Sequence, residues 1–361
     1  MQSALALASR GLGTVWPNPA VGCVITDESG RVAGRGWTQA GGRPHAETEA
    51  LRQSGGRAAG GTAYVTLEPC SHHGQTPPCA EALIAAKLKR VVVACVDPDP
   101  RVSGAGIRRL QAAGLIVATG LYEDEARELN AGFFHRILDK RPLVTLKFAT
   151  SLDGKIATHR GDSRWITGER SRQLAHVLRA NHDAIMVGVG TAIADNPELT
   201  CRLPGLEHRS PVRIVLDGRL RLPLTAKLVA EAKRVPTWLI SLAEAASGER
   251  RQVYADCGVE IIEVEANSAG HPSMKLALTA LAERGLTRLL VEGGSHIAAA
   301  MLSARVVDRI VWFRAPSMIG GDGIPAAQGF GVDRIADLAR FTRISLQEAG
   351  DDVVEMYRRT D

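Results

Sequence analysis

The sequence is poor in aromatic residues and has no long apolar run. Phe, Trp and Tyr make up 4% of its 361 residues, which leaves few platforms on which the bases of a single-stranded nucleic acid stack. No apolar run reaches membrane-spanning length. The start of the chain also lacks the basic segment, apolar core and cleavage site of a signal peptide. We therefore expect a cytoplasmic protein that binds neither membranes nor nucleic acids.

Cysteine is scarce as well. Six cysteines in a cytoplasmic chain of this length argue against a disulfide framework, so each is a candidate metal ligand or a small core residue. Cys23, Cys95, Cys201 and Cys257 stand in strand-like or isolated contexts and are expected in the core. The net charge of +5, from 44 basic and 39 acidic residues, comes without a basic stripe and suits a small anionic substrate such as a phosphate.

The chain has the length of two domains rather than one. In the first part, hydrophobic patterns predict strands at residues 20–26, 32–37, 62–67, 90–96 and 115–119, and helices at 46–54, 80–88, 107–113 and 123–138. Charges and a proline at 139–142 mark a boundary, so we expect domains at 1–142 and 143–361. The second part predicts strands at 143–149, 184–188, 212–216, 236–241, 259–264, 287–292 and 308–314, helices at 169–180, 273–284 and 295–304, and two last strands within 341–358. Alternating strands and helices predict an α/β fold for both parts.

Three local features of the first domain combine into a metal site. His45 opens a helix, Cys70 follows a strand, and Cys79 lies in the first turn of the next helix. One imidazole and two thiolates give zinc three protein ligands and leave the fourth tetrahedral position for water, as in catalytic sites. Glu47, two residues after His45, is placed to carry a proton without binding the metal. This order of residues is typical of zinc deaminases.

Other interpretations of this cluster stay open at this point. Zinc deaminases usually have two residues between the cysteines, whereas eight lie between Cys70 and Cys79. His72 and His73, on that inserted loop, are rival ligands. The cluster is also compatible with a structural zinc, or with two ordinary core cysteines.

The second domain has two glycine turns that follow predicted strands. One is at 188–191 and the other at 292–295, the latter before a helix, where backbone amides can approach a phosphate. Neither matches the Rossmann fingerprint, but together they favour a dinucleotide.

These motifs resemble the bifunctional pyrimidine deaminase/reductase family of riboflavin biosynthesis. The resemblance rests on PNPAVG (17–22), PHAE (44–47), TLEPCSHHGQTPPC (66–79), KFATSLDG (147–154), SRWIT (163–167), ADNP (194–197) and VEGGS (291–295). It covers essentially the whole chain, and the long loop between the cysteines is the family's own form.

The resemblance implies a cytidine-deaminase-like α/β/α domain followed by a dihydrofolate-reductase-like α/β domain. It implies deamination of 2,5-diamino-6-(5-phosphoribosylamino)pyrimidin-4-one with one Zn²⁺ per chain, then NADPH-dependent reduction of the ribosyl to a ribityl group. The implied partner is thus a small phosphoribosyl pyrimidine, and the oligomeric state, including a homo-oligomer, stays open.

The resemblance also implies site residues. Asn18 is implied as a contact to the pyrimidine ring in the first site. The implied cofactor contacts are Ala149, Trp165, Thr191, Asp195, Gly294, Ser295, His296, Ile297, Ala298, Ala299 and Ala300. The implied substrate contacts of the second site are Lys147, Ser163, Arg179, Leu199, Arg202 and Glu292. Arginines and a serine suit a ribose phosphate, and Asp195 is the candidate proton donor for reduction.

Two positions depart from the family pattern. Gln75 stands where a basic residue is common and Asp99 where Asn is common, which leaves the phosphate anchor of the first site open, with Arg101 as a substitute. Arg219 and Arg221, after a predicted strand, are candidates for a 2′-phosphate. The rival functions are a cytidine or nucleic-acid base deaminase with an appended domain, and a zinc-stabilised binding module without activity.

Overall fold

The computed structural model describes residues 1–72, 77–100, 102–245 and 247–360. The chain divides into two compact units, Met1–Lys140 and Arg141–Asp361. The expected boundary, after residue 142, lies two residues beyond this division. Arg141 belongs to the second unit because its guanidinium donates to both carboxylate oxygens of Asp308, at 2.6 and 2.7 Å.

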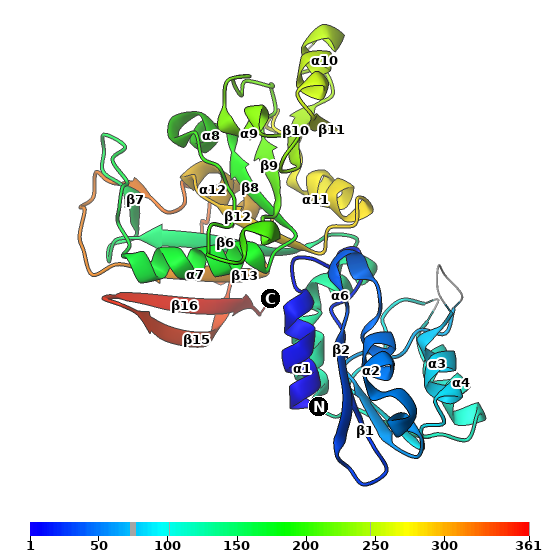
Figure 1. Cartoon of the computed structure of the whole chain (residues 1–361). Helices are drawn as coiled ribbons and strands as arrows, with labels where there is room; N and C mark the ends of the chain where they lie inside the picture. Colours follow the sequence, from blue (N-terminus) through cyan, green and yellow to red (C-terminus); the bar gives the residue numbers. More distant parts are fainter. Residues whose placement is uncertain (73–76, 101, 246, 361) are drawn as a thin grey trace. The chain divides into compact units, whose positions relative to one another are not determined.

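A single mixed sheet forms the centre of the first unit (Figure 1). Its order among the described residues is β2-β1-β3-β4-β5, with antiparallel pairing of β1 to β2 and β3, and parallel pairing from β3 to β5. The strands are β1 Gly22–Thr26, β2 Val32–Trp37, β3 Thr62–Val65, β4 Arg90–Val93 and β5 Ile116–Thr119. All five coincide with predicted strands.

Helices cover both faces of this sheet. The helix α2 contacts α3, and α3 contacts α4, so these three share one face, while α1 contacts α5 on the other. Their bounds are α1 Gln2–Ala8, α2 Ala46–Ser54, α3 Cys79–Ala85, α4 Ala105–Ala112, α5 Glu123–Leu129 and α6 Ala131–Leu138. Glycine lets α2 approach β2 closely: a Cβ at Gly36 would lie 2.1 Å from the Ala46 carbonyl oxygen. The first turn of α2 is thereby held against the sheet.

The predicted continuous helix over 123–138 is wrong, because Asn130 interrupts it between α5 and α6. The Asn130 side chain is buried, accepts the N–H of Ala20 and donates to the Ala20 carbonyl oxygen, both at 2.9 Å. A buried side-chain amide that satisfies both backbone groups of one residue replaces a strand partner for that residue. It fixes the segment that carries Asn18 two residues earlier.

The second unit is built on a larger sheet. Its order among the described residues is β11-β10-β9-β8-β12-β6-β13-β16-β15, parallel from β11 to β13 and antiparallel for the last two strands. The strands are β6 Leu143–Thr150, β8 Ala184–Gly188, β9 Val212–Leu216, β10 Thr237–Leu242, β11 Val259–Val264, β12 Arg288–Glu292, β13 Arg309–Arg314, β15 Phe341–Ala349 and β16 Asp352–Arg359. A short antiparallel pair, β7 Lys155–Ala157 and β14 Ile324–Pro325, is separate from it.

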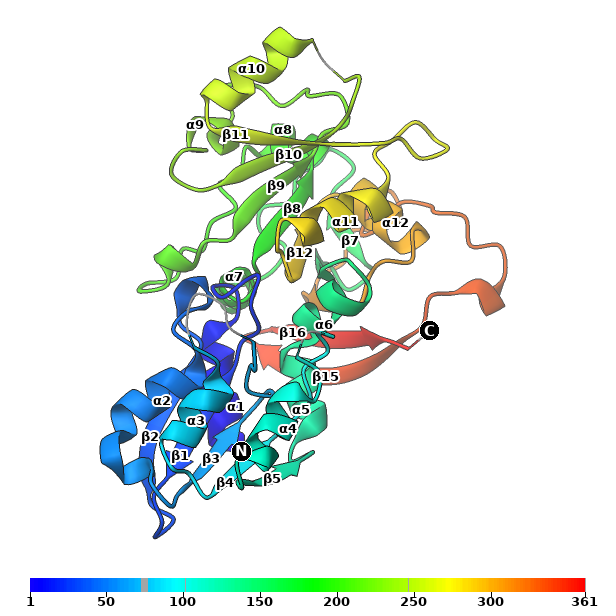
Figure 2. The ribbon, with the colours of Figure 1, turned by 90° about the vertical axis from the view of Figure 1, so that its right-hand side faces the viewer.

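Helices also lie on both faces of this larger sheet. Figure 2 shows α11 and α12 on the opposite side from α7. The bounds are α7 Glu169–Ala180, α8 Val189–Asp195, α9 Lys227–Ala230, α10 Gly248–Asp256, α11 Met274–Glu283 and α12 Ser295–Ser303. The helices α8, α9 and α10 follow none of the predictions. The segment 188–191, interpreted as a glycine turn, instead starts α8 directly after β8.

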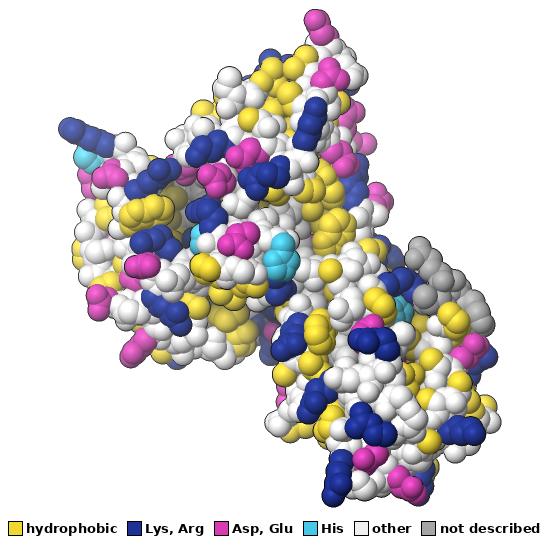
Figure 3. All heavy atoms as spheres, viewed as in Figure 1, with side chains coloured by type: hydrophobic (Ala, Val, Ile, Leu, Met, Phe, Trp, Pro, Cys, Tyr) yellow, Lys and Arg dark blue, Asp and Glu magenta, His cyan; other side chains and the backbone are white. Residues whose placement is uncertain are grey.

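Within the described ranges, no helix is both long and apolar enough to cross a membrane. On the face seen in Figure 3, Lys and Arg side chains are scattered among uncharged and acidic ones on both units rather than gathered in a stripe. That face matches the mild, dispersed charge of the composition.

Candidate active sites

The predicted metal ligands of the first unit lie together. The ligand atoms of His45, Cys70 and Cys79 are all within 4.8 Å of one another. The Nδ1 atom of His45 is 3.2 Å from the Cys79 sulfur and 3.7 Å from the Cys70 sulfur. A tetrahedral zinc with ordinary bond lengths requires about 3.5–3.8 Å between such atoms. The donor set fits zinc: the His45–Cys70 distance lies in this range, and the His45–Cys79 distance is about 0.3 Å shorter than it.

Local structure explains why these three residues converge. His45 is the extended residue that precedes α2, and Cys79 is the first residue of α3. The backbone N–H of Cys79 donates to the Cys70 sulfur, and that of Ala80 donates to the Cys70 carbonyl oxygen. Hydrogen bonds from the Cys79 side chain and from His45 lower the pKa of Cys70 to about 4. The hydrogen bond between the two thiols raises the pKa of Cys79. Cys70 is thus held as the thiolate that a metal requires.

Glu47 lies beside this cluster but is not part of it. It is in the first turn of α2, is 3% exposed, and interacts with the Cys79 thiol. Burial raises its pKa to about 7, against the opposing effect of His45. A carboxyl group that exchanges a proton near neutral pH, next to a metal site, suits general acid–base catalysis.

The rival ligands do not join the cluster where they are described. His72 is exposed, and among the described residues only His45, Cys70 and Cys79 form a candidate metal group. His73, Gln75 and Arg101 lie outside the described residues. Asp99 is buried, and its backbone N–H donates to the Asp97 carboxylate.

The other cysteines behave largely as expected. Cys23, Cys95 and Cys201 are buried, whereas Cys257 is only partly buried at the edge of a core cluster. All are free thiols.

Asn18 is held near the segment that leads to His45. A Cβ on Gly42 would lie 1.9 Å from the Asn18 amide nitrogen, so the two residues are packed as closely as glycine allows. Gly42 is three residues before His45, so the side chain implied as a ring contact packs against the segment that leads to a predicted metal ligand.

Sequence reasoning missed Glu68, which directly precedes Pro69 and Cys70. Its side chain is 3% exposed and accepts backbone N–H groups from Asp97 at 3.3 Å, Gly104 at 2.8 Å and Gly106 at 2.9 Å. This carboxylate links the start of α4 to the segment after β3 that contains Cys70. The partners lie 29–38 residues away in the sequence, so no local pattern could have identified them.

The second unit contains a cavity of about 1410 Å³ at the carboxyl ends of its parallel strands. Of the implied contacts, Leu199 and Ala299 are not among the described residues that line it, and the side chains of both are buried. The implied contacts on its wall are Lys147, Ala149, Ser163, Trp165, Arg179, Thr191, Asp195, Arg202, Glu292, Gly294, Ser295, His296, Ile297, Ala298 and Ala300.

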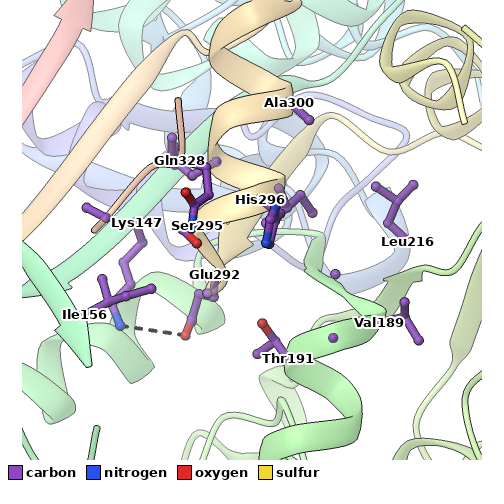
Figure 4. A pocket seen from close by; sticks show the side chains of 18 of the residues that line it. Lys147, Ile156, Val189, Thr191, Leu216, Glu292, Ser295, His296, Ala300 and Gln328 are labelled. Atoms are coloured by element: carbon purple, nitrogen blue, oxygen red, sulfur yellow. Dashed lines mark ion pairs between the residues drawn. The ribbon is translucent and has the colours of Figure 1, made fainter. Parts of the chain in front are cut away.

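A buried charge cluster forms one end of this cavity. Arg179 donates to both carboxylate oxygens of Glu292, at 2.8 and 2.9 Å, and Lys147 Nζ is 3.8 Å from Glu292 (Figure 4). Burial alone would raise the pKa of Glu292, but the charges of Arg179 and Lys147 lower it to about 2. Burial lowers the pKa of Lys147. The carboxylate is therefore ionised and fixes both cations in place.

The glycine turn lies next to this cluster. Gly293 and Gly294 both have positive φ, and Gly294 precedes α12. A Cβ on Gly294 would lie 2.8 Å from the Thr191 hydroxyl oxygen, so only glycine fits there. Figure 4 shows Thr191 between Glu292 on one side and Leu216 on the other. The bare backbone and the nine-residue helix behind it fit the phosphates of a dinucleotide.

The remaining polar wall residues are more exposed. Asp195 ends α8 with an exposed side chain, while its carbonyl oxygen accepts from Arg164 at 3.2 Å. Trp165 is 69% exposed, with the Arg172 guanidinium 4.8 Å from its ring centre. Arg202 is exposed and 3.7 Å from Glu198.

Comparison with known proteins agrees with a deaminase domain followed by a reductase domain. Residues 1–95 match the family described as cytidine and deoxycytidylate deaminase zinc-binding region, and residues 142–354 match the RibD C-terminal domain. The chain is 42% identical to the riboflavin biosynthesis protein RibD of Aquifex aeolicus, covering 99% of this chain and 97% of the relative. It is 38% identical to the Escherichia coli RibD, covering 98% and 96%.

Solved structures give the same result. The Acinetobacter baumannii RibD, form 1, has a TM-score of 0.89 at 38% identity and covers 100% of this chain and 98% of its own. A Thermotoga maritima protein has a TM-score of 0.87 at 34% identity, covering 100% and 97%. That protein is named as a diaminohydroxyphosphoribosylaminopyrimidine deaminase/5-amino-6-(5-phosphoribosylamino)uracil reductase.

The fold and the sites define a bifunctional enzyme, with a cytidine-deaminase-like domain followed by a reductase domain. Zinc and NADPH are the cofactors that these two domains imply. The chain belongs to the RibD family of riboflavin biosynthesis proteins. The predicted fold class, enzyme class and cofactors are thereby confirmed, and the rival functions are not favoured.

Proposed function

We propose that the chain deaminates 2,5-diamino-6-(5-phosphoribosylamino)pyrimidin-4-one in its first domain and reduces the ribosyl group of the product in its second. The observation that carries the first half is the three-ligand cluster with the buried Glu47 carboxyl group beside it. The two activities in the name of the Thermotoga maritima protein support this choice of substrate. The proposed setting is the cytoplasm, with this small molecule as the partner and no nucleic acid.

In the deaminase site, we assign His45, Cys70 and Cys79 to the metal. Zinc held there supplies the Lewis acidity that activates water near neutral pH. Glu47 then takes the proton from the attacking water and delivers it to the departing amine, which its pKa of about 7 suits. Asn18, packed on Gly42, is assigned to the pyrimidine ring.

In the reductase site, NADPH supplies the hydride, and the residues at the charged end of the cavity position the substrate. Lys147 lies near Glu292 and over the Phe313 ring, and we assign its ammonium group to a ring carbonyl of the pyrimidine. Arg179 is fully engaged with Glu292 and the Thr200 carbonyl oxygen, so it orients Glu292. Arg202 and Ser163 are then better placed for the phosphate, and Asp195 is assigned as the proton donor.

The deciding experiment is mass spectrometry of the diaminopyrimidine after incubation with the enzyme, with and without NADPH. Without NADPH, we expect the ring amine to be replaced by oxygen and the sugar to remain intact. With NADPH, the ribityl product follows. A reduced compound that retains its ring amine would show the opposite order, and conversion of free cytidine would favour the rival deaminase.

We also expect the second unit to act alone. A fragment 141–361 keeps the Arg141–Asp308 ion pair and every described residue that lines the cavity, so it should bind NADPH and reduce the deaminated intermediate. It should not convert the aminated compound, because the zinc ligands are in 1–140. A folded fragment that binds no NADPH would contradict the proposed division of labour between domains.

A further inference from the structure

The cavity of the second unit continues well beyond the charge cluster at Lys147 and Glu292. The strand order β9-β8-β12-β6 places the carboxyl end of β9 three strand spacings from that of β6. At about 4.8 Å per spacing, this separation is about 14 Å. An extended dinucleotide covers a distance of this order between its nicotinamide ring and its adenosine. With the nicotinamide beside Lys147 and the diphosphate at Gly294, the adenosine therefore reaches the end of β9.

Two arginines stand at that end of the cavity. Arg219 and Arg221 follow β9 directly, both are exposed, and both line the cavity wall. In the part of the chain that the structure describes, neither guanidinium has a hydrogen-bond or ion-pair partner. Lys275, at the start of α11, lines the same cavity and is exposed as well. The positive charges of the two arginines and the lysine exceed the negative charge of the nearby buried Asp217 carboxylate, so this end of the cavity is positively charged.

The turn that carries the two arginines is rigidly built. Leu220 and Leu222, which alternate with them, are both 0% exposed, and this alternation turns both arginines outward. The Asp217 carboxylate accepts the Leu222 N–H at 2.7 Å, and its carbonyl oxygen accepts the Leu220 N–H at 3.1 Å. Leu220 has φ of +49°, a conformation that leucine rarely adopts and that surrounding contacts must hold.

Residues of α10 complete this support. The Tyr254 hydroxyl, itself buried, donates to the Leu222 carbonyl oxygen, and Arg250 donates twice to the Leu220 carbonyl oxygen, at 3.0 and 2.6 Å. Solvated surface arginines need no such support. A fixed pair of unpartnered guanidinium groups instead suits a phosphate, which accepts hydrogen bonds from both.

We infer that Arg219 and Arg221 bind the 2′-phosphate of NADPH and make the reductase select NADPH over NADH. This inference rests on the proposed placement of the dinucleotide in the cavity. The discrimination comes from the ionic contacts alone, because the rest of the two cofactors is identical. Loss of either arginine should therefore weaken the binding of NADPH and leave the binding of NADH unchanged.

The test is equilibrium binding to the full-length protein, by calorimetry, of NADPH, NADH, adenosine 2′,5′-bisphosphate and adenosine 5′-monophosphate. For Arg219→Ala and Arg221→Ala, we expect affinity for NADPH and the bisphosphate to fall by about tenfold to hundredfold, the range for one charge-assisted hydrogen bond. Affinity for NADH and the monophosphate should stay as in the wild type, which also shows that each variant is folded. Arg340→Ala, at an exposed position away from the cavity, is the matched control.

Equal losses for NADPH and NADH, or no loss for either, would overturn this assignment while leaving the proposed reductase intact. A wild-type protein that binds neither dinucleotide would overturn the proposed function together with it.

Discussion

Replacement of Glu47 by glutamine should leave zinc bound and slow deamination by about 100-fold or more. Glutamine keeps the size of the buried side chain but cannot take up and release a proton. A 100-fold loss corresponds to about 2.7 kcal/mol of transition-state stabilisation, within the usual contribution of a general acid–base group. The measurements are turnover of the diaminopyrimidine and zinc content of the purified protein, side by side.

The matched control for this variant is Glu49→Gln, on the same helix. Glu49 is half-buried and pairs with Arg52 at 2.9 Å, outside the metal cluster. We expect its turnover and zinc content to match the wild type. Near-normal turnover of Glu47→Gln would remove Glu47 from the mechanism, and loss of zinc from it would instead make Glu47 a metal ligand.

The candidate zinc site could be predicted from the sequence because each proposed ligand stands at the end of a helix or strand that short sequence patterns predict. His45 precedes a helix, Cys70 follows a strand, and Cys79 starts a helix, so short patterns place all three. Strands β2 and β3, which precede these ligands, both pair antiparallel with β1, so their carboxyl ends lie at one edge of the sheet. The proximity of His45, Cys70 and Cys79 follows from this topology.

Features that depend on distant partners could not be predicted. Asn130 breaks a helix that looks continuous, because its partner is Ala20, 110 residues earlier. Arg213 is another case, since a charged residue in a strand usually faces solvent. It is 0% exposed, donates to the Thr237 hydroxyl at 3.0 Å and to the carbonyl oxygens of Leu228 and Val235. Long-range hydrogen bonding of this kind leaves no periodic signal.

In the second unit, the sequence also could not predict which of the implied contacts line the cavity. Similarity to the family implied contacts along the whole stretch 294–300, but in a helix consecutive residues point in different directions. Ala299 is therefore not among the described residues that line the cavity, whereas its neighbours Ala298 and Ala300 are. The helix α10 was missed because its sequence, GERRQVYAD, is mostly polar and only Tyr254 of it is buried.

Substitution of either cysteine of the candidate zinc site should abolish deamination. Cys70→Ser or Cys79→Ser replaces a thiolate by a hydroxyl group, which remains protonated at neutral pH and is a poor zinc ligand. The two remaining ligands hold the metal weakly, so zinc content and deamination should be lost together. NADPH-dependent reduction of the deaminated intermediate should persist, because the cavity of the second unit contains neither cysteine. Metal analysis and separate assays of the two reactions measure this split.

Cys257→Ser is the control for these variants, since Cys257 is a free, partly buried thiol of the second unit outside the metal cluster. It should retain about one zinc per chain and full deamination. Full zinc content in both Cys70→Ser and Cys79→Ser would mean that other side chains hold the metal. His72 and His73, on the loop between the cysteines, are then the ligands to replace next. Loss of zinc from only one of the two variants would reduce the thiolate set to that cysteine and require a different third ligand.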